Sequence, residues 1–227
     1  MKYITKLIFF STSCLIFSNL LSKDITIEKF TTDDIYKIKN IHSVDLSDSA
    51  NQITYIETFA DKKNDDYRST LWLHDIKKNK SKKLIKKIKS ISYPQFSPDE
   101  KYIAYISPGK RELENYSQLW VINLKTARKR ELTKIKNNVT DFQWSPDGKK
   151  IAIVVNHKEE DTEDTRHPIV IERYQFKKDG YDFIENENQH IHIKYLDQKE
   201  MTQITEGAYD HVLPSWSPDG EKLAFAS

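Results

Sequence analysis

The chain of 227 residues is poor in cysteine and glycine, with one cysteine, Cys14, and five glycines. A single thiol cannot close an intramolecular disulfide or build a Cys-based zinc site. The sequence also lacks the Gly-rich loop that nucleotide-binding proteins use to hold phosphates. Its 36 basic and 34 acidic residues nearly cancel, and a neutral chain gives no support for nucleic-acid binding. We therefore expect neither nucleic acid nor a cofactor as a ligand.

Long apolar runs are scarce as well. The N-terminus begins with Lys2 and Lys6, and its apolar stretches are Leu7–Phe10 and Leu15–Leu21. These stretches are too short and interrupted for a stable membrane span, but they fit a secretory signal. We predict a signal peptide over residues 1–22 and an exported, periplasmic or secreted chain with no stable membrane span after cleavage. An uncleaved membrane anchor is the alternative.

What the chain does contain is a repeated turn, each copy followed by charged residues and an apolar strand. Ser-Pro-Asp-Gly suits a type I turn, since proline presets φ and glycine takes the last position without steric cost. Glu100 replaces that glycine in one copy, which predicts slight strain. In the weakest copy Asn51 is expected to tolerate the left-handed backbone. The copies are Val44–Ser49, Phe96–Glu100, Trp144–Gly148 and Trp216–Gly220.

The spacing of the turns indicates a repeat architecture. Successive turn serines lie about 50, about 48 and about 72 residues apart, and the first two spacings are close to the length of one four-stranded propeller blade. The third spacing is one blade plus an insertion. Short runs rich in β-branched and aromatic residues separate the turns, as expected for strands. The sequence therefore predicts an all-β fold, an incomplete β-propeller of TolB-like or WD-like four-stranded blades, with about three blades plus part of a fourth.

The same pattern divides the chain. After the signal peptide, residues 23–42 form a lead-in with one helix near Thr32–Ile38, where the acidic residues Asp33 and Asp34 favour the helix N-terminus. Residues 43–227 form the partial propeller. We place its blades at about 43–86, 91–134, 139–206 with an inserted arm over 157–188, and 211–227, the last incomplete.

Three features together resemble the N-terminal β-propeller of the prolyl oligopeptidase family of serine peptidases, in particular the bacterial dipeptidyl aminopeptidase and acylaminoacyl-peptidase type. They are the lead-in Phe30–Ile38, the Ser-Pro-Asp blades, and the inserted segment His167–Gly180 followed by His190–His192. The resemblance implies a propeller that gates the access of peptides to a hydrolase domain with a Ser-Asp-His triad. No Gly-x-Ser-x-Gly elbow occurs in the chain. We therefore assign no catalytic residue and expect a chain truncated before its hydrolase domain and inactive alone. The alternative is a TolB-like periplasmic propeller that acts as a protein–protein binding module.

The inserted arm is the strongest candidate for contacts with a substrate or a partner, because a long excursion between blade strands needs a reason. Arg173, Tyr174 and Phe176 could face the mouth of the propeller or the partner in a homo-oligomer. An equally weighted alternative is a β-hairpin packed on its own blade. Glu159 and Glu160 open an acidic loop. In the dipeptidyl-peptidase branch such residues capture the peptide N-terminus, whereas a solvated loop is the more ordinary interpretation.

The histidines and tryptophans are interpreted as structural. His190 and His192 lie two residues apart on one strand and share a face, but no third ligand is spaced nearby, so we expect ordinary blade positions and no metal site. His157, His167 and His211 have no recognisable partner in the sequence. The four tryptophans occupy repeat-equivalent positions, which predicts that they lie in the blade core.

Overall fold

The computed structural model describes residues 29–158 and 187–227. The chain divides into two units at residue 35, and the second unit spans residues 36–227. The helix η1, Thr32–Lys37, is a 3-10 helix rather than an α-helix. The carboxylate of Asp34 accepts hydrogen bonds from the Thr31 backbone N–H (2.6 Å) and hydroxyl (2.8 Å), which satisfies a donor that the short helix cannot.

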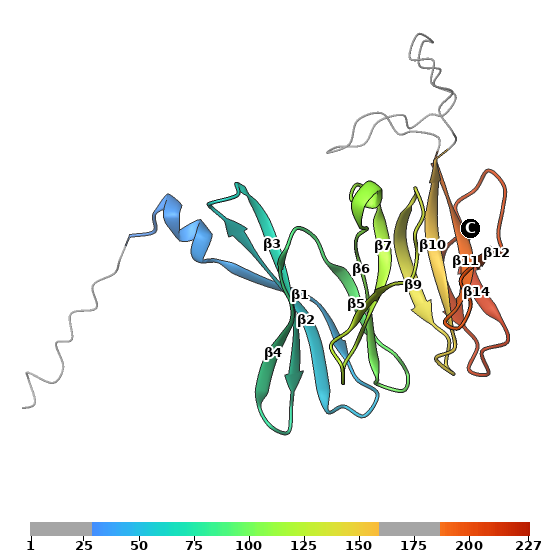
Figure 1. Cartoon of the computed structure of the whole chain (residues 1–227), viewed down its shortest axis with the longest axis horizontal. Helices are drawn as coiled ribbons and strands as arrows, with labels where there is room; N and C mark the ends of the chain where they lie inside the picture. The colour runs from blue at the N-terminus through green and yellow to red at the C-terminus, as the bar shows by residue number, and fades with distance from the viewer. Residues whose placement is uncertain (1–28, 159–186) are drawn as a thin grey trace, which may run out of the picture. The chain divides into compact units, whose positions relative to one another are not determined.

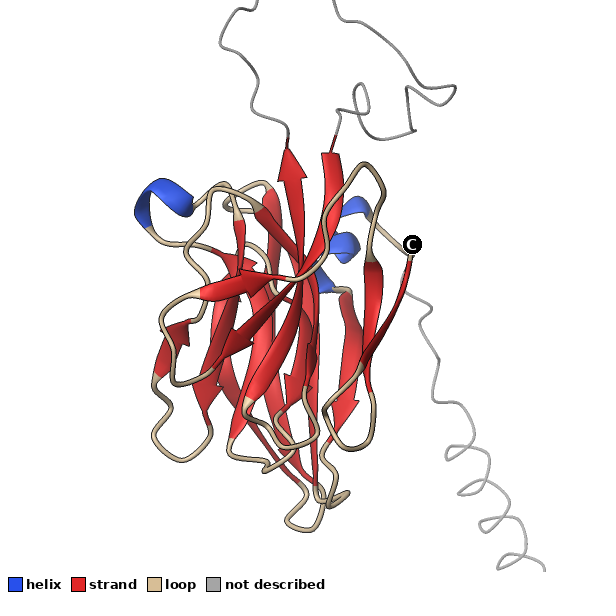
Figure 2. Ribbon diagram, turned by 90° about the vertical axis from the view of Figure 1, so that its right-hand side faces the viewer, coloured by secondary structure: helices blue, strands red, loops and turns tan. Residues whose placement is uncertain are grey.

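The described strands all belong to the unit 36–227 and pair antiparallel in four sheets, which follow one another in chain order (Figure 1; the strands are red in Figure 2). Sheet 1 contains β1 (Lys39–Leu46), β2 (Gln52–Asp61), β3 (Asp66–Asp75) and β4 (Lys80–Ile88). Sheet 2 contains β5 (Ser92–Phe96), β6 (Tyr102–Pro108), β7 (Ser117–Asn123) and β8 (Lys129–Glu131), with the 3-10 helix η2 (Arg111–Leu113) between β6 and β7. Sheet 3 contains β9 (Asn138–Trp144), β10 (Lys150–Lys158), β11 (Glu187–Tyr195) and β12 (Met201–Gln203). Sheet 4 contains β13 (Val212–Trp216) and β14 (Leu223–Ala226).

In each sheet neighbouring strands follow in sequence, from an inner strand (β1, β5, β9 or β13) outward. Each inner strand is joined to the next strand by one copy of the repeated turn. Over the described residues the sheets form an open series and do not close on themselves. The predicted fold class, an all-β incomplete propeller, is confirmed.

The turns owe their shape to one serine hydroxyl. Oγ of Ser145 accepts the backbone N–H of Lys150 (2.9 Å) and donates to Asp147 (2.6 Å), whose carboxylate also accepts the Lys149 N–H (3.0 Å). The same bonds recur around Ser97 and Ser217. These bonds hold the pKa values of the three turn carboxyls below their usual range, and the serine makes the largest lowering contribution in each case. At Asp99 burial raises the pKa, and the bonds together outweigh that effect. The carboxyls are Asp99, Asp147 and Asp219.

The last turn position is left-handed in all four copies, with φ of 67° at Gly148 and 70° at Gly220. Glu100 takes the same conformation with φ of 53°, which agrees with the expected strain for a residue with a side chain. In the weakest copy the left-handed residue is Ala50, with φ of 54°, so the prediction for Asn51 was wrong. Ala50 donates its N–H to the Ser47 carbonyl (2.8 Å), and this turn bond selects position 50.

Apolar side chains fill the space between successive sheets. Leu71 and Ile56 of sheet 1 pack with Ile103 and Ile122 of sheet 2. A second cluster lies between sheets 2 and 3, and its members include Phe142. A third, smaller cluster joins Ala152, Val154 and Ile191 to the apolar residues of β13 and β14. The core is therefore divided into layers between sheets, so each sheet is stabilised mainly by its neighbours.

The tryptophans are not equivalent in this packing. Trp120 and Trp144 are buried in the core, as predicted. Trp72 lies half-buried and stacks on Tyr55, with ring planes 10° apart. Trp120 stacks on Tyr105 in the same way one sheet later. The repeat therefore preserves the tyrosine–tryptophan pair, although only the pair of sheet 2 lies in the core between two described sheets.

Candidate functional site: a groove along the inner strands

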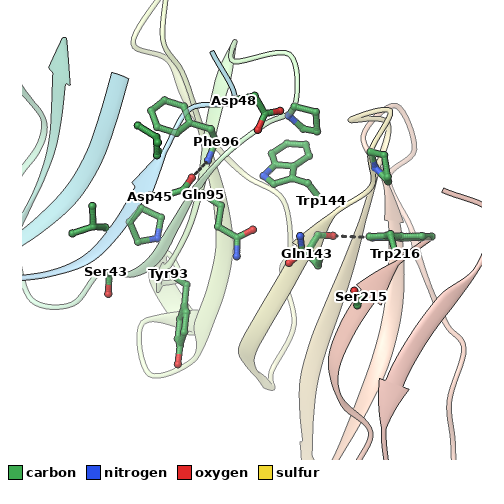
Figure 3. A pocket seen from close by; sticks show the side chains of 15 residues that line it. Ser43, Asp45, Asp48, Tyr93, Gln95, Phe96, Gln143, Trp144, Ser215 and Trp216 are labelled. Atoms are coloured by element: carbon green, nitrogen blue, oxygen red, sulfur yellow. Dashed lines mark hydrogen bonds between the residues drawn. The ribbon is translucent and has the colours of Figure 1, made fainter. Parts of the chain in front are cut away.

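The inner strands carry a repeated polar residue two positions before the turn serine. These residues are Asp45, Gln95, Gln143 and Ser215. They line a groove of about 750 Å³ to which all four sheets contribute (Figure 3). Phe96, Trp144 and Trp216 add aromatic surface to the same groove. The sequence analysis missed this site, although a polar side chain two positions before the turn serine in all four repeats was a signal that could have found it.

Local irregularities of the strands position these side chains. The pairing of β1, β5 and β13 with the following strand shifts register just before the polar residue. The shifted segments contain Ser43, Tyr93 and Leu213, each with a left-handed φ between 50° and 55°. Such β-bulges bend a strand and re-aim the side chains that follow. The repeat therefore includes a β-bulge that sets the direction in which the groove side chains point.

Polar bonds across the sheet junctions fix the floor of the groove. Asp45 accepts the backbone N–H of Phe96 (2.8 Å), and the Gln95 amide donates to the Phe142 carbonyl (3.3 Å). At the next junction the Trp216 indole N–H donates to the Gln143 carbonyl (3.1 Å) (Figure 3). Each inner strand is thus tied to the next by one hydrogen bond, which holds the groove at a defined width.

Burial raises the pKa of the Asp45 carboxyl, and the bonds from Phe96 and Leu46 oppose that rise while the charge of Asp48 adds to it. Burial also raises the pKa of Asp141 on β9, against a hydrogen bond from the Phe142 N–H. The groove offers carboxylates, amides, hydroxyls and aromatic faces. These groups suit the backbone and side chains of an extended peptide, which presents both donors and acceptors.

Two serine–histidine contacts occur in the described residues, and one of them involves Ser43 of the groove lining. His42 Nδ1 lies 3.0 Å from the Ser43 hydroxyl, and His74 Nδ1 lies 2.9 Å from the Ser81 hydroxyl. His42 uses its other ring nitrogen on Thr58 (3.0 Å). Among the described hydrogen bonds no carboxylate orients either imidazole, whereas a Ser-His-Asp triad needs that third group.

The predicted contact residues of the arm, Arg173, Tyr174, Phe176, Glu159 and Glu160, lie outside the described residues. Although the sequence analysis related only His190 and His192, as residues on one face of a strand, the structure brings together four of the seven histidines. They are His157, His190, His192 and His211. In the described ranges 29–158 and 187–227 no group of three or more ligating side chains is placed to hold a metal ion. Those same ranges contain no helix with the length and apolarity that a membrane crossing would require.

Known proteins with a similar sequence or fold include peptidases and also an oligogalacturonate lyase, whose structure superposes with a TM-score of 0.53 at 16% identity. No family model matches the chain. The uncharacterized peptidase YuxL of Bacillus subtilis (strain 168) is 25% identical over 202 residues, which cover 87% of this chain and 31% of YuxL. This chain thus spans about a third of the length of that relative.

Solved structures show the same likeness. The Pyrococcus horikoshii acylaminoacyl peptidase superposes with a TM-score of 0.63 at 21% identity, over 78% of this chain and 26% of the peptidase. The tricorn protease superposes with a TM-score of 0.57 at 14% identity, over 82% of this chain and 15% of the protease. The chain resembles, in sequence and in fold, the N-terminal β-propeller portion of peptidases of the acylaminoacyl-peptidase type, as its motifs predicted.

Proposed function

We propose that the chain is the N-terminal propeller portion of an exported serine peptidase of the prolyl oligopeptidase family, where it gates the access of peptides to a hydrolase domain. The observation that carries the proposal is the groove along the inner strands, which all four sheets line with peptide-compatible groups. The match to less than a third of a peptidase supports it. On this proposal the chain selects by size and supplies no bond-breaking group.

A chemical assay on the purified chain tests the proposal that it supplies no bond-breaking group. We expect no turnover of peptide p-nitroanilides and no covalent labelling by a fluorophosphonate probe, because an activated serine is needed for both. Pyrococcus horikoshii acylaminoacyl peptidase serves as the positive control. Labelling of this chain would contradict the proposal, and the labelled residue would identify the nucleophile.

The coding sequence beyond codon 227 tests the peptidase assignment independently. A Gly-x-Ser-x-Gly elbow within a few hundred codons supports it, since that motif places the nucleophile of an α/β-hydrolase. A stop codon after further Ser-Pro-Asp repeats would overturn it and would favour the TolB-like binding module.

Export is tested by fusion. Residues 1–22 joined to a β-lactamase that lacks its own signal should confer ampicillin resistance, because that enzyme protects cells only from outside the cytoplasm. The same fusion without residues 1–22 is the control. Resistance equal in both fusions, or absent from both, would contradict the export proposal.

A further inference from the structure

A basic cleft runs along β8, the outer strand of sheet 2. It consists of two adjoining parts, of about 460 Å³ and about 510 Å³, which share Arg130, Glu131 and Lys134. Seven basic and two acidic side chains line the two parts. Lys194 is the one buried basic residue. The exposed basic residues of the cleft are Lys110, Arg111, Lys129, Arg130, Lys134 and Lys199.

The charge of this region contrasts with that of the whole chain. The chain has 36 basic and 34 acidic residues, whereas residues 124–136, which include β8, have six basic residues and one acidic residue, Glu131. The carboxylate of Glu131 accepts the backbone N–H of Lys110 (3.2 Å). The ion pairs of the described residues join side chains outside the cleft. The basic cleft therefore carries a net positive charge.

The floor of the cleft contains a buried charge. Lys194 is 4% exposed, and the equivalent residue of sheet 2 is the fully buried Ile122. A lysine in place of a core isoleucine costs free energy unless polar groups surround its charge. Lys194 meets this need by donating to three backbone carbonyls, those of Gln198, Lys199 and Glu200. It thereby fixes the hairpin between β11 and β12 and adds its charge to the floor.

A second cation is held close to this buried charge. Arg130 donates from its guanidinium to the Leu196 carbonyl (3.4 Å), so its side chain reaches from sheet 2 to sheet 3. Burial lowers the pKa of Lys194 and the charge of Arg130 lowers it further, while Glu200 acts in the opposite direction. The fold thus places two like charges near each other, at a cost in free energy that a bound anion would offset.

The surface donors of the cleft come from three segments on a packed base. Arg130 lies on β8, Lys134 follows that strand, and Lys199 lies on the hairpin before β12. The ammonium groups of Lys134 and Lys199 take part in none of the described hydrogen bonds, so their donors are available to a ligand. Apolar residues beneath them belong to the core between sheets 2 and 3, which makes the base rigid. These residues are Leu132, Ile135 and Met201.

We propose that the basic cleft binds a phosphate-bearing anion, free in solution or carried by a lipid headgroup, through Arg130, Lys134 and Lys199. A phosphate group carries about two negative charges and three strong acceptor oxygens, so it can accept donors from three segments at once. A carboxylate offers two oxygens in one plane. The guanidinium supplies paired N–H donors, and the lysines supply compact charges. The proposal does not depend on the peptidase assignment.

Isothermal titration calorimetry of the whole chain with sodium pyrophosphate, at an ionic strength of about 0.1 M, tests the site. We expect saturable binding that Arg130→Gln weakens at least about 10-fold, because charge-assisted donors are lost. Lys199→Gln, on an exposed hairpin, should weaken it by about 3-fold or more. Lys86→Gln is the matched control, since it removes an exposed lysine of β4 outside the cleft and should change the affinity by less than about 2-fold.

Titration with citrate at the same ionic strength separates phosphate from carboxylate chemistry, and equal affinity for citrate and pyrophosphate would overturn the proposal. An equal loss of affinity in Lys86→Gln and Arg130→Gln would overturn it as well, because the anion would then respond to overall charge alone. If Arg130→Gln fails to fold, the comparison of Lys199→Gln with Lys86→Gln gives the decision.

Sedimentation with lipid vesicles identifies the source of the phosphate. Binding to vesicles of phosphatidylglycerol and phosphatidylcholine, but not to phosphatidylcholine alone, assigns the site to a lipid headgroup if Lys199→Gln weakens it. Binding of pyrophosphate without binding to these vesicles assigns the site to a free anion. Absence of binding to pyrophosphate and to the vesicles alike would refute the proposal.

Discussion

Removal of one turn hydroxyl, Ser145→Ala, should destabilise the chain far more than the same change at Ser217. Both hydroxyls make the same bonds: each accepts a backbone N–H five residues on and donates to the aspartate two residues on. Ser145 is fully buried, whereas the bonds of Ser217 are exposed. The pair therefore isolates the effect of burial on a conserved set of bonds within one molecule.

The magnitude follows from what each alanine leaves behind. At position 145 the Lys150 N–H loses its hydroxyl acceptor, and a buried donor without a partner costs about 1–3 kcal/mol. At position 217 water can replace the hydroxyl, so the cost is about 0.5–1 kcal/mol. We expect Ser145→Ala to lower the free energy of unfolding by about 2 kcal/mol and Ser217→Ala by less than about 1 kcal/mol.

Urea denaturation followed by tryptophan fluorescence measures both values, since a change of midpoint at constant slope reports stability alone. Equal costs for the two variants would refute the reasoning, because they would show that the buried hydroxyl does not hold the turn. A larger cost for Ser217→Ala would refute it as well.

Three further predictions test other parts of the structure. Phe142→Ala, which empties a 1% exposed site between sheets 2 and 3, should cost about 3–5 kcal/mol in the same denaturation assay, and a cost below about 1 kcal/mol would contradict the layered core. Because the turn carboxyls have lowered pKa values, their contribution to stability is present at neutral pH and is lost as pH falls below about 4. A triple variant with Asp99→Asn, Asp147→Asn and Asp219→Asn should therefore show a smaller fall in Tm between about pH 4 and about pH 2. An unchanged fall in Tm would contradict this expectation. The outer edge of β14 has no partner strand among the described residues and carries the 44% exposed Phe225, so the isolated chain should self-associate; a monomer in light scattering at micromolar concentration would contradict that expectation.

The fold class could be predicted from sequence because the repeated turn is specified locally. A serine, an aspartate and a left-handed residue within six positions make all of its bonds, so the motif carries its own geometry. The choice between Ala50 and Asn51 was not settled by residue preference. Asparagine tolerates the left-handed region better than alanine, yet the hydrogen bond of the turn fixes position 50.

The groove and the histidine cluster depend on contacts that local sequence does not specify. His157 and His192 lie 35 residues apart, and they meet because β10 and β11 pair with Ile153 opposite His192. A one-residue change of that register would move the histidines to opposite faces. The alternation along β10 indicates that residues 151, 153, 155 and 157 share one face. It identifies their neighbours on β11 only once the register between β10 and β11 is known.

The most direct test of the central claim, that successive sheets stack through equivalent turns, is a set of proton–proton nuclear Overhauser effects between turns. The position that a β-carbon would take on Gly148 lies 3.6 Å from Pro98 Cδ. The corresponding position on Gly220 lies 3.5 Å from Pro146 Cδ. We predict cross-peaks between the Hα protons of each glycine and the Hδ protons of the proline one turn earlier. Absence of both cross-peaks in a folded, assigned sample would contradict the stacked arrangement.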